Sequence, residues 1–147
     1  MKYFIDTSSF LKLYHTEEGT DTLLEILHRK DFDGIYLSTL AKVEFVSAMW
    51  RKIRMKELAQ EEGIDTINDF LSDDAKFFWV DVTSEIMGVA ISLLQKHGNK
   101  GLRTLDAIQL ASAEQAVRLS SAELSCITSD KTLATIMQEN GLRAVLL

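Results

Sequence analysis

Five short apolar runs alternate with longer amphipathic segments along the chain. The runs cover residues 2–5, 34–38, 77–82, 124–128 and 143–147. Each is about five residues long, too short for a helix and rich in aromatic or β-branched side chains, so each predicts a strand. Continuous apolar strands separated by helices are typical of a parallel sheet covered on both faces. The sequence therefore predicts an α/β fold with a mostly parallel central sheet.

The segments between these runs have helical periodicity. We expect helices over residues 8–14, 16–30, 39–55, about 57–72, 83 or 84 to about 97, 104 onward, and 131–140. Thr16 and Thr104 are the expected N-caps of two of them, and Gly141 is expected to follow the last helix as its C′ residue. The helix over 39–55 is predicted to be amphipathic, with an apolar side formed by Val43, Val46, Trp50 and Ile53.

Length and composition limit the classes of protein to which the chain can belong. The chain has 147 residues, no proline and no linker-like stretch, which favours a single domain over residues 1–147. It has no apolar run of about 18 residues, the length of a membrane-spanning helix, and Asp6 interrupts any apolar signal-peptide region. The one cysteine, Cys126, excludes a disulfide framework and favours a cytoplasmic location; it is predicted to be a buried strand residue. The three histidines lack the spacing of a zinc site.

Two aspartates lie at or just after the ends of predicted strands. Asp6 comes after the run 2–5, and Asp130 comes two residues after the run 124–128. Because the carboxyl ends of parallel strands meet at one edge of a sheet, where α/β proteins bind ligands, both are expected at that edge. Each could equally cap the helix that follows it.

Two further carboxylates lie on predicted helices without an evident basic partner. Glu44 has only small or apolar residues three and four positions away, and Asp106 has Gln109 and Leu110 at i+3 and i+4. Asp106 also suits the first turn of a helix, and a single Glu beside a buried face is often partly solvated. If the four carboxylates converge, a divalent cation among them would make their repulsion tolerable. Oxygen ligands favour Mg²⁺ or Mn²⁺, which support phosphodiester hydrolysis.

Other functions of α/β domains find no support in the motifs. The first strand leads into DTS, whereas a phosphatase of the haloacid dehalogenase type requires D-x-D. The acidic pair and the lysine of a receiver domain are absent, and no glycine-rich nucleotide-binding loop occurs.

Four blocks of the sequence resemble, in order, the motif blocks of PIN-domain proteins. The blocks are FIDTSSFLKLY, LSTLAKVEFVSAM, LRTLDAIQLASA and ITSDKTLATIMQENGLRAV. They look most like the small VapC-type toxins of bacterial and archaeal toxin–antitoxin pairs, and the resemblance spans essentially the whole chain. It implies a three-layer α/β/α fold and a Mg²⁺- or Mn²⁺-dependent endoribonuclease site.

The same resemblance implies roles for individual residues. The acidic quartet would be Asp6, Glu44, Asp106 and Asp130. Asp6 and Asp106 would bind the main metal ion, Glu44 would help to hold it or to orient water, and Asp130 would bind a second ion or the first through water. Ser8 and Thr128 match hydroxyl positions near the site. Gln109 stands where many members carry histidine, which leaves the acidic set complete.

Partners are the least constrained part of the interpretation. The net charge of −6 disfavours a nucleic-acid partner, but the segment 51–56 has four basic residues in six. We expect RNA phosphates to contact Arg51, Lys52, Arg54, Lys100 and Arg103. The resemblance further implies an antitoxin whose C-terminal segment wraps the toxin, and a homodimer. A PIN-like module that binds RNA or protein without cleavage, and a metal-dependent phosphatase of small esters, remain alternatives.

Overall fold

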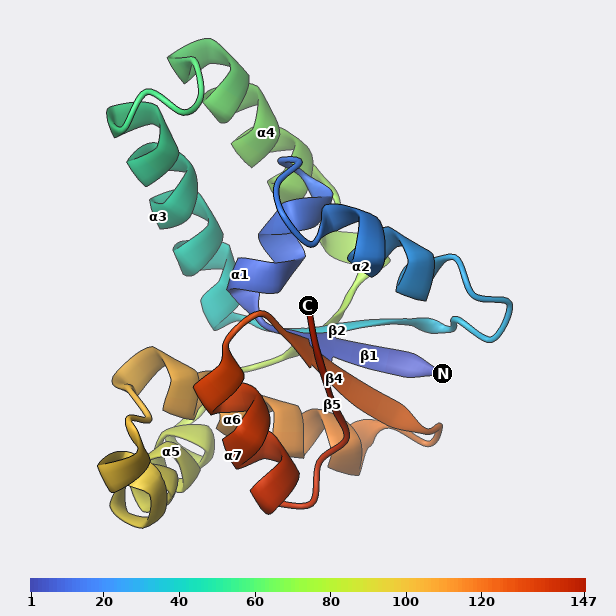
Figure 1. Cartoon of the computed structure of the whole chain (residues 1–147), viewed down its shortest axis with the longest axis vertical. Coiled ribbons are helices and arrows are strands. Elements are labelled where there is room, and N and C mark those ends of the chain that lie inside the picture. The colour runs from blue at the N-terminus through green and yellow to red at the C-terminus, as the bar shows by residue number, and fades with distance from the viewer.

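A five-stranded, all-parallel sheet forms the centre of the molecule in a computed structural model of residues 1–147 (Figure 1). The strands lie in the order β3-β2-β1-β4-β5. Their bounds are β1 Lys2–Ile5, β2 Gly34–Ser38, β3 Phe78–Val80, β4 Leu124–Thr128 and β5 Ala144–Leu146. In the register, Phe4 of the central strand β1 pairs with Tyr36 of β2 and Cys126 of β4. Every strand lies at or within two residues of the position predicted from its apolar run.

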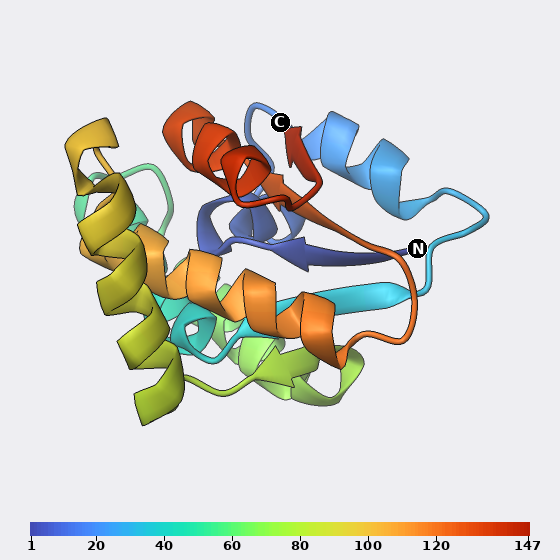
Figure 2. The same cartoon turned by 90° about the horizontal axis from the view of Figure 1, so that it is seen from below.

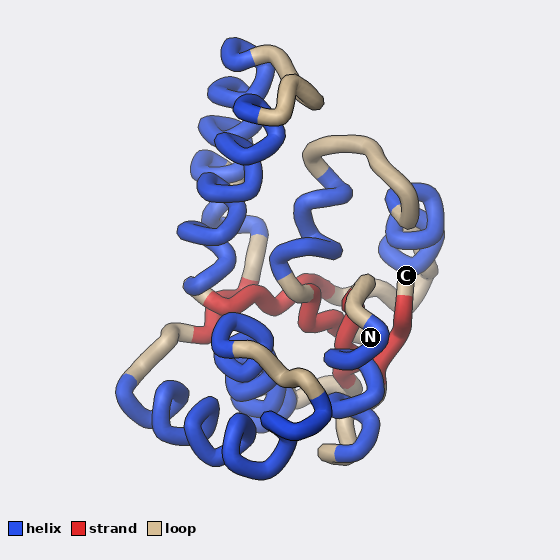
Figure 3. The backbone as a smooth tube through the Cα atoms, turned by 60° about the vertical axis from the view of Figure 1, so that its left-hand side comes forward, coloured by secondary structure: helices blue, strands red, loops and turns tan.

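Helices cover both faces of the sheet and produce three layers (Figure 3). One face carries α1 Thr7–Phe10, α2 Thr20–Leu27, α3 Leu40–Arg54 and α4 Gln60–Ser72; the other carries α5 Ser84–His97, α6 Thr104–Leu119 and α7 Lys131–Glu139. Short 3₁₀ turns lie at Leu11–Leu13, Asp74–Lys76 and Gly98–Lys100. Figure 2 shows α5 and α6 packed against each other beneath the sheet. The predicted three-layer α/β/α architecture is confirmed.

The alternation of side chains along the strands creates two separate cores. On β1, Tyr3 and Ile5 pack with α1–α4, whereas Phe4 packs with α5–α7. Cys126 lies in the second core and is fully buried, as predicted. Burial raises its pKa to about 12, so this thiol is protonated and unreactive at neutral pH. No helix is long and apolar enough to cross a membrane.

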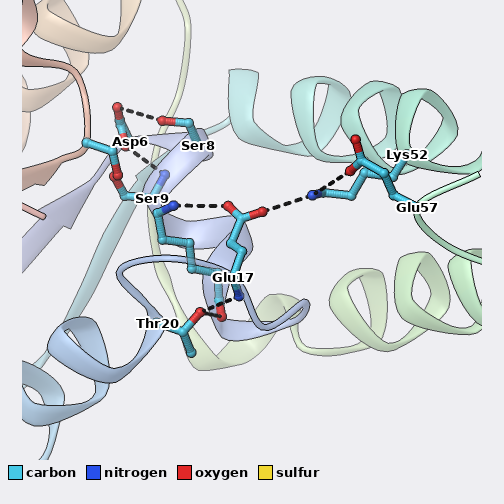
Figure 4. A network of polar contacts seen from close by, with 9 residues as sticks. Asp6, Ser8, Ser9, Glu17, Thr20, Lys52 and Glu57 are labelled. Carbon is cyan, nitrogen blue, oxygen red and sulfur yellow. Dashed lines mark hydrogen bonds and ion pairs between the residues drawn. The ribbon is translucent and has the colours of Figure 1, made fainter. Parts of the chain in front are cut away.

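The N-terminal helices are shorter than their sequence pattern predicts. The segment 8–14 divides into α1 and a 3₁₀ turn, and α2 begins at Thr20 after Gly19, with φ of 93°, so Thr16 is not its N-cap. The side chain of Thr20 accepts the Glu17 amide and donates to the Lys12 carbonyl, while the Glu17 carboxylate binds Lys12 and Lys52 (Figure 4). These contacts hold residues 15–19 as a loop.

The apolar side predicted for α3 is wrong in part. Val43 is 70% exposed and Trp50 is 37% exposed, whereas Ala41, Phe45 and Met49 form the buried face. The Phe45 ring stacks on Phe70 of α4 with centroids 4.1 Å apart. Phe45 also packs against Phe10 of α1, with ring centroids 6.4 Å apart, so the contacts of this aromatic cluster set the rotation of the helix. Figure 1 shows α3 and α4 projecting together from the body of the molecule.

The ends of the last two helices are close to the prediction. Thr104 is the first residue of α6 and not its N-cap; Arg103 holds the N-cap position without a side-chain hydrogen bond. Asp130 caps α7, because its Oδ1 accepts the Leu133 amide at 2.9 Å. Gly141 follows α7 with φ of 79°, which confirms the predicted C′ glycine.

Candidate active site

A cleft of about 520 Å³ opens at the carboxyl ends of β1 and β4. Four acidic residues line it, although they come from four different elements: Asp6 follows β1, Glu44 lies on α3, Asp106 lies on α6 and Asp130 precedes α7. The rest of its lining is Ser8, Arg51, Arg103, Thr104 and Leu105. The structure thus brings together all four carboxylates that the sequence singles out.

Asp6 is the most buried of the four, with 5% of its surface exposed. Its Oδ1 accepts the Ser9 amide at 3.0 Å, so it caps α1, while its Oδ2 accepts the hydroxyls of Ser8 at 3.2 Å and Thr128 at 2.7 Å. Figure 4 shows its contacts with Ser8 and Ser9. Burial raises the pKa of Asp6, and these hydrogen bonds only partly oppose that rise.

Two side chains that were not predicted as ligand-holding residues, Thr7 and Gln109, fix the carboxylate of Glu44. Its Oε1 accepts the Thr7 hydroxyl and the Gln109 amide, both at 2.8 Å, and the Gln109 amide also donates to the Thr7 hydroxyl oxygen at 2.8 Å. Burial raises the pKa of Glu44, and the charges of Asp6 and Asp106 raise it further. The sequence feature that could have indicated this role is a polar residue, Gln109, within an apolar stretch of α6 and one turn after Asp106.

Asp106 and Asp130 share a cationic neighbour, Arg103. Its Nε lies 3.3 Å from Asp106 Oδ2, and its Nη2 lies 3.7 Å from Asp130 Oδ2. The expectation that Asp106 lacks a basic partner is therefore wrong, because the partner lies three residues before it instead of one turn after it.

The predicted basic residues are divided between the cleft and other contacts. Arg51 and Arg103 line the cleft. Lys52 binds Glu17 at 2.9 Å and Glu57 at 3.6 Å, and Lys100 binds Glu139, the last residue of α7. Arg54 is exposed at the end of α3, outside the cleft lining. The two arginines are thus the cations that face the carboxylates.

Comparison with known proteins identifies the fold and the family. The family model described as PIN domain matches residues 3–136. The chain belongs to the PIN domain family. No curated protein matches the chain.

Solved structures of toxin–antitoxin proteins share this PIN fold. VapBC2 from Rickettsia felis, bound to a DNA fragment from its promoter, has a TM-score of 0.66 and 16% identity over 99% of this chain and 98% of that one. A toxin–antitoxin complex from Klebsiella pneumoniae has a TM-score of 0.62 and 17% identity over 90% of both chains. VapC20 from Mycobacterium tuberculosis, described as a toxin that cleaves the sarcin–ricin loop, has a TM-score of 0.59 and 16% identity over 78% of this chain and 83% of that one.

The donor set of this PIN domain fits a hard divalent cation that retains water. All its candidate ligands are carboxylate oxygens, and three of these, Glu44 Oε2, Asp106 Oδ1 and Asp130 Oδ2, accept no hydrogen bond from the protein. No three acidic, histidine or cysteine side chains are gathered closely enough to hold an ion by themselves. Mg²⁺ is usually bound by one or two carboxylates and several waters, so it suits carboxylates that surround a cleft without meeting at one point.

Proposed function

We propose that this PIN domain is a Mg²⁺- or Mn²⁺-dependent endoribonuclease and the toxin of a toxin–antitoxin pair. The observation that carries the proposal is the arrangement of Asp6, Glu44, Asp106 and Asp130 around one cleft, at the edge of the sheet where α/β proteins bind ligands. When bound there, the ion would activate water for attack on a phosphodiester and stabilise the leaving oxygen.

The chain's own residues have distinct tasks in this proposal. Asp6 and Asp106 would hold the ion, and Asp130 would bind a second ion or the first through water. Thr7 and Gln109 fix one oxygen of Glu44, which leaves its Oε2 free to hold the ion or to orient its water. The hydroxyls of Ser8 and Thr128 fix Asp6. Arg51 and Arg103 contact the RNA backbone, since guanidinium groups pair well with phosphate.

An antitoxin partner is supported by what the structural neighbours are. Their descriptions name a toxin–antitoxin complex from Klebsiella pneumoniae and VapBC2 from Rickettsia felis. A nuclease that attacks cellular RNA must be inhibited, and an acidic cleft offers a place for a cationic side chain of the inhibitor. We extend the proposal to a cytoplasmic protein that forms a homodimer and is inhibited at this cleft by an arginine from the antitoxin's C-terminal segment.

The proposal is tested by cleavage of mixed RNA with Mn²⁺, measured beside hydrolysis of a generic phosphate ester. Asp6→Asn and Asp106→Asn should each remove most of the cleavage, at least about a hundredfold, because one substitution removes both ion binding and water activation. Cys126→Ser, in the core, is the control and should retain activity. Normal RNA cleavage by both aspartate variants would exclude the mechanism. Ester hydrolysis without RNA cleavage would favour a phosphatase, and RNA binding without either activity would favour a silent module.

A further inference from the structure

Arg103 lies between two carboxylates of the cleft and is paired with both. Its backbone is extended, with φ of −101° and ψ of 169°, at the position just before α6. The side chain therefore leaves the start of the helix and reaches Asp106 Oδ2 and Asp130 Oδ2, at 3.3 and 3.7 Å. Arg51, the other cation of the cleft lining, forms no ion pair. Arg103 alone thus neutralises part of the acidic cleft from within.

One of the two oxygens that contact Arg103, Asp130 Oδ2, is also the oxygen that Asp130 would offer to a metal ion. Asp130 Oδ1 is already occupied by the Leu133 amide, so Oδ2 is the oxygen that Asp130 can offer to a ligand. Asp106 contacts the guanidinium through one oxygen and keeps the other free of hydrogen bonds. The side chain of Arg103 is 77% exposed, and ion pairs this accessible to water are weak and readily exchanged. A divalent cation bound by Asp130 Oδ2 would therefore displace Arg103 from that oxygen, and the charge of the ion would repel the guanidinium from the neighbouring Asp106.

We propose that Arg103 is an internal counter-cation, which holds Asp106 and Asp130 in the metal-free protein and leaves them when a divalent cation binds. This inference rests on the proposed function, because it requires these carboxylates to bind the ion. Neutralising carboxylates that repel each other stabilises the empty cleft, and the same contacts lower its affinity for metal. Once displaced, Arg103 becomes available for the contact with RNA phosphate described above.

The test is a calorimetric titration of Mn²⁺ into the protein without RNA, for the wild type and for Arg103→Gln. Glutamine retains a polar side chain of moderate length and removes the charge. We expect Arg103→Gln to bind Mn²⁺ about two- to tenfold more tightly, the range given by one or two exposed ion pairs. Arg103→Lys keeps the charge but cannot bridge both carboxylates with a planar fork, so its affinity should lie between the two.

Lys100→Gln is the matched control, because it removes one positive charge that is paired with Glu139 at the end of α7, outside the cleft lining. Its affinity for Mn²⁺ should equal that of the wild type. Equal affinities for the wild type and Arg103→Gln would overturn the inference and leave the proposed function intact. Equal gains in Arg103→Gln and Lys100→Gln would also overturn it, because net charge would then explain the effect. If neither the wild type nor Arg103→Gln binds Mn²⁺, both the inference and the proposed metal-dependent function fail.

Discussion

At the scale of single residues, Asp6 and Asp130 use different oxygens for the fold and for the cleft. Each accepts, through Oδ1, an amide of the helix that follows it, from Ser9 or Leu133. Through Oδ2, Asp6 contacts Ser8 and Asp130 contacts Arg103, and both of these partners line the cleft. A helix cap requires one acceptor oxygen, and a carboxylate has two. The capping and site interpretations are therefore compatible, which is why the sequence pattern alone could not decide between them.

Gln109 is expected to act on RNA cleavage through Glu44. Gln109→Leu removes the amide that fixes Glu44, so we expect cleavage to fall by about ten- to a hundredfold, as for other residues that orient metal ligands. Gln109→His, which introduces the residue common in the family, should retain a donor and much of the activity.

A double-mutant cycle that combines Gln109→Leu with Glu44→Gln tests whether Gln109 acts through Glu44. Because Gln109 acts through Glu44, the double variant should cleave no more slowly than Glu44→Gln alone, as measured in single-turnover assays. Losses that multiply in the double variant would show that Gln109 has a role independent of Glu44.

At the scale of elements, helix positions are set by contacts that a local pattern does not contain. On α3, the series Val43, Val46, Trp50 and the series Ala41, Phe45, Met49 both have helical spacing. The second is buried because Phe45 meets Phe70 and Phe10, which come from α4 and α1. The strands were predicted more closely, because a short apolar run buried on both faces needs no knowledge of its neighbours.

The exposed and buried faces of α3 give a direct test of this arrangement. Phe45→Ala should lower the free energy of unfolding by about 3–5 kcal/mol, because it leaves a cavity in an aromatic cluster. Val43→Ala, on the exposed side of the same helix, should change it by no more than about 0.5 kcal/mol. Denaturant unfolding monitored by circular dichroism measures both. A larger loss in Val43→Ala than in Phe45→Ala would contradict the observed rotation of α3.

At the scale of the whole molecule, the chain order explains the place of the cleft. From the central strand β1 the chain adds β2 and then β3 toward one edge of the sheet, and later adds β4 and β5 toward the opposite edge. Crevices form where the strand order reverses, here between β1 and β4. The positions of Asp6 and Asp130 follow from this rule. The contact between Gln109 and Glu44 joins residues 65 apart and depends on how α3 and α6 approach, which no local pattern records.

Removal of the divalent ion should destabilise the whole domain, and the effect should depend on pH. The folded-state pKa values of Asp6 and Glu44 are raised, mainly by burial. The folded protein therefore binds these protons more readily than the unfolded chain, and the stability they contribute is lost as pH rises through the raised pKa values. Mg²⁺ replaces those protons, so its affinity rises over the same pH range.

We therefore expect the difference in melting temperature between samples with Mg²⁺ and with EDTA to increase as pH rises above 4.5, the ordinary pKa of a glutamate side chain. A ligand at about a hundred times its Kd contributes about 2.7 kcal/mol, which raises the melting temperature of a domain of this size by about 5–10 °C. Asp106→Asn should reduce the difference at every pH while the metal-free variant remains folded, since it loses a ligand and relieves repulsion in the cleft. A melting temperature insensitive to Mg²⁺ across this range, or a difference that shrinks as pH rises, would contradict carboxylate binding of the ion.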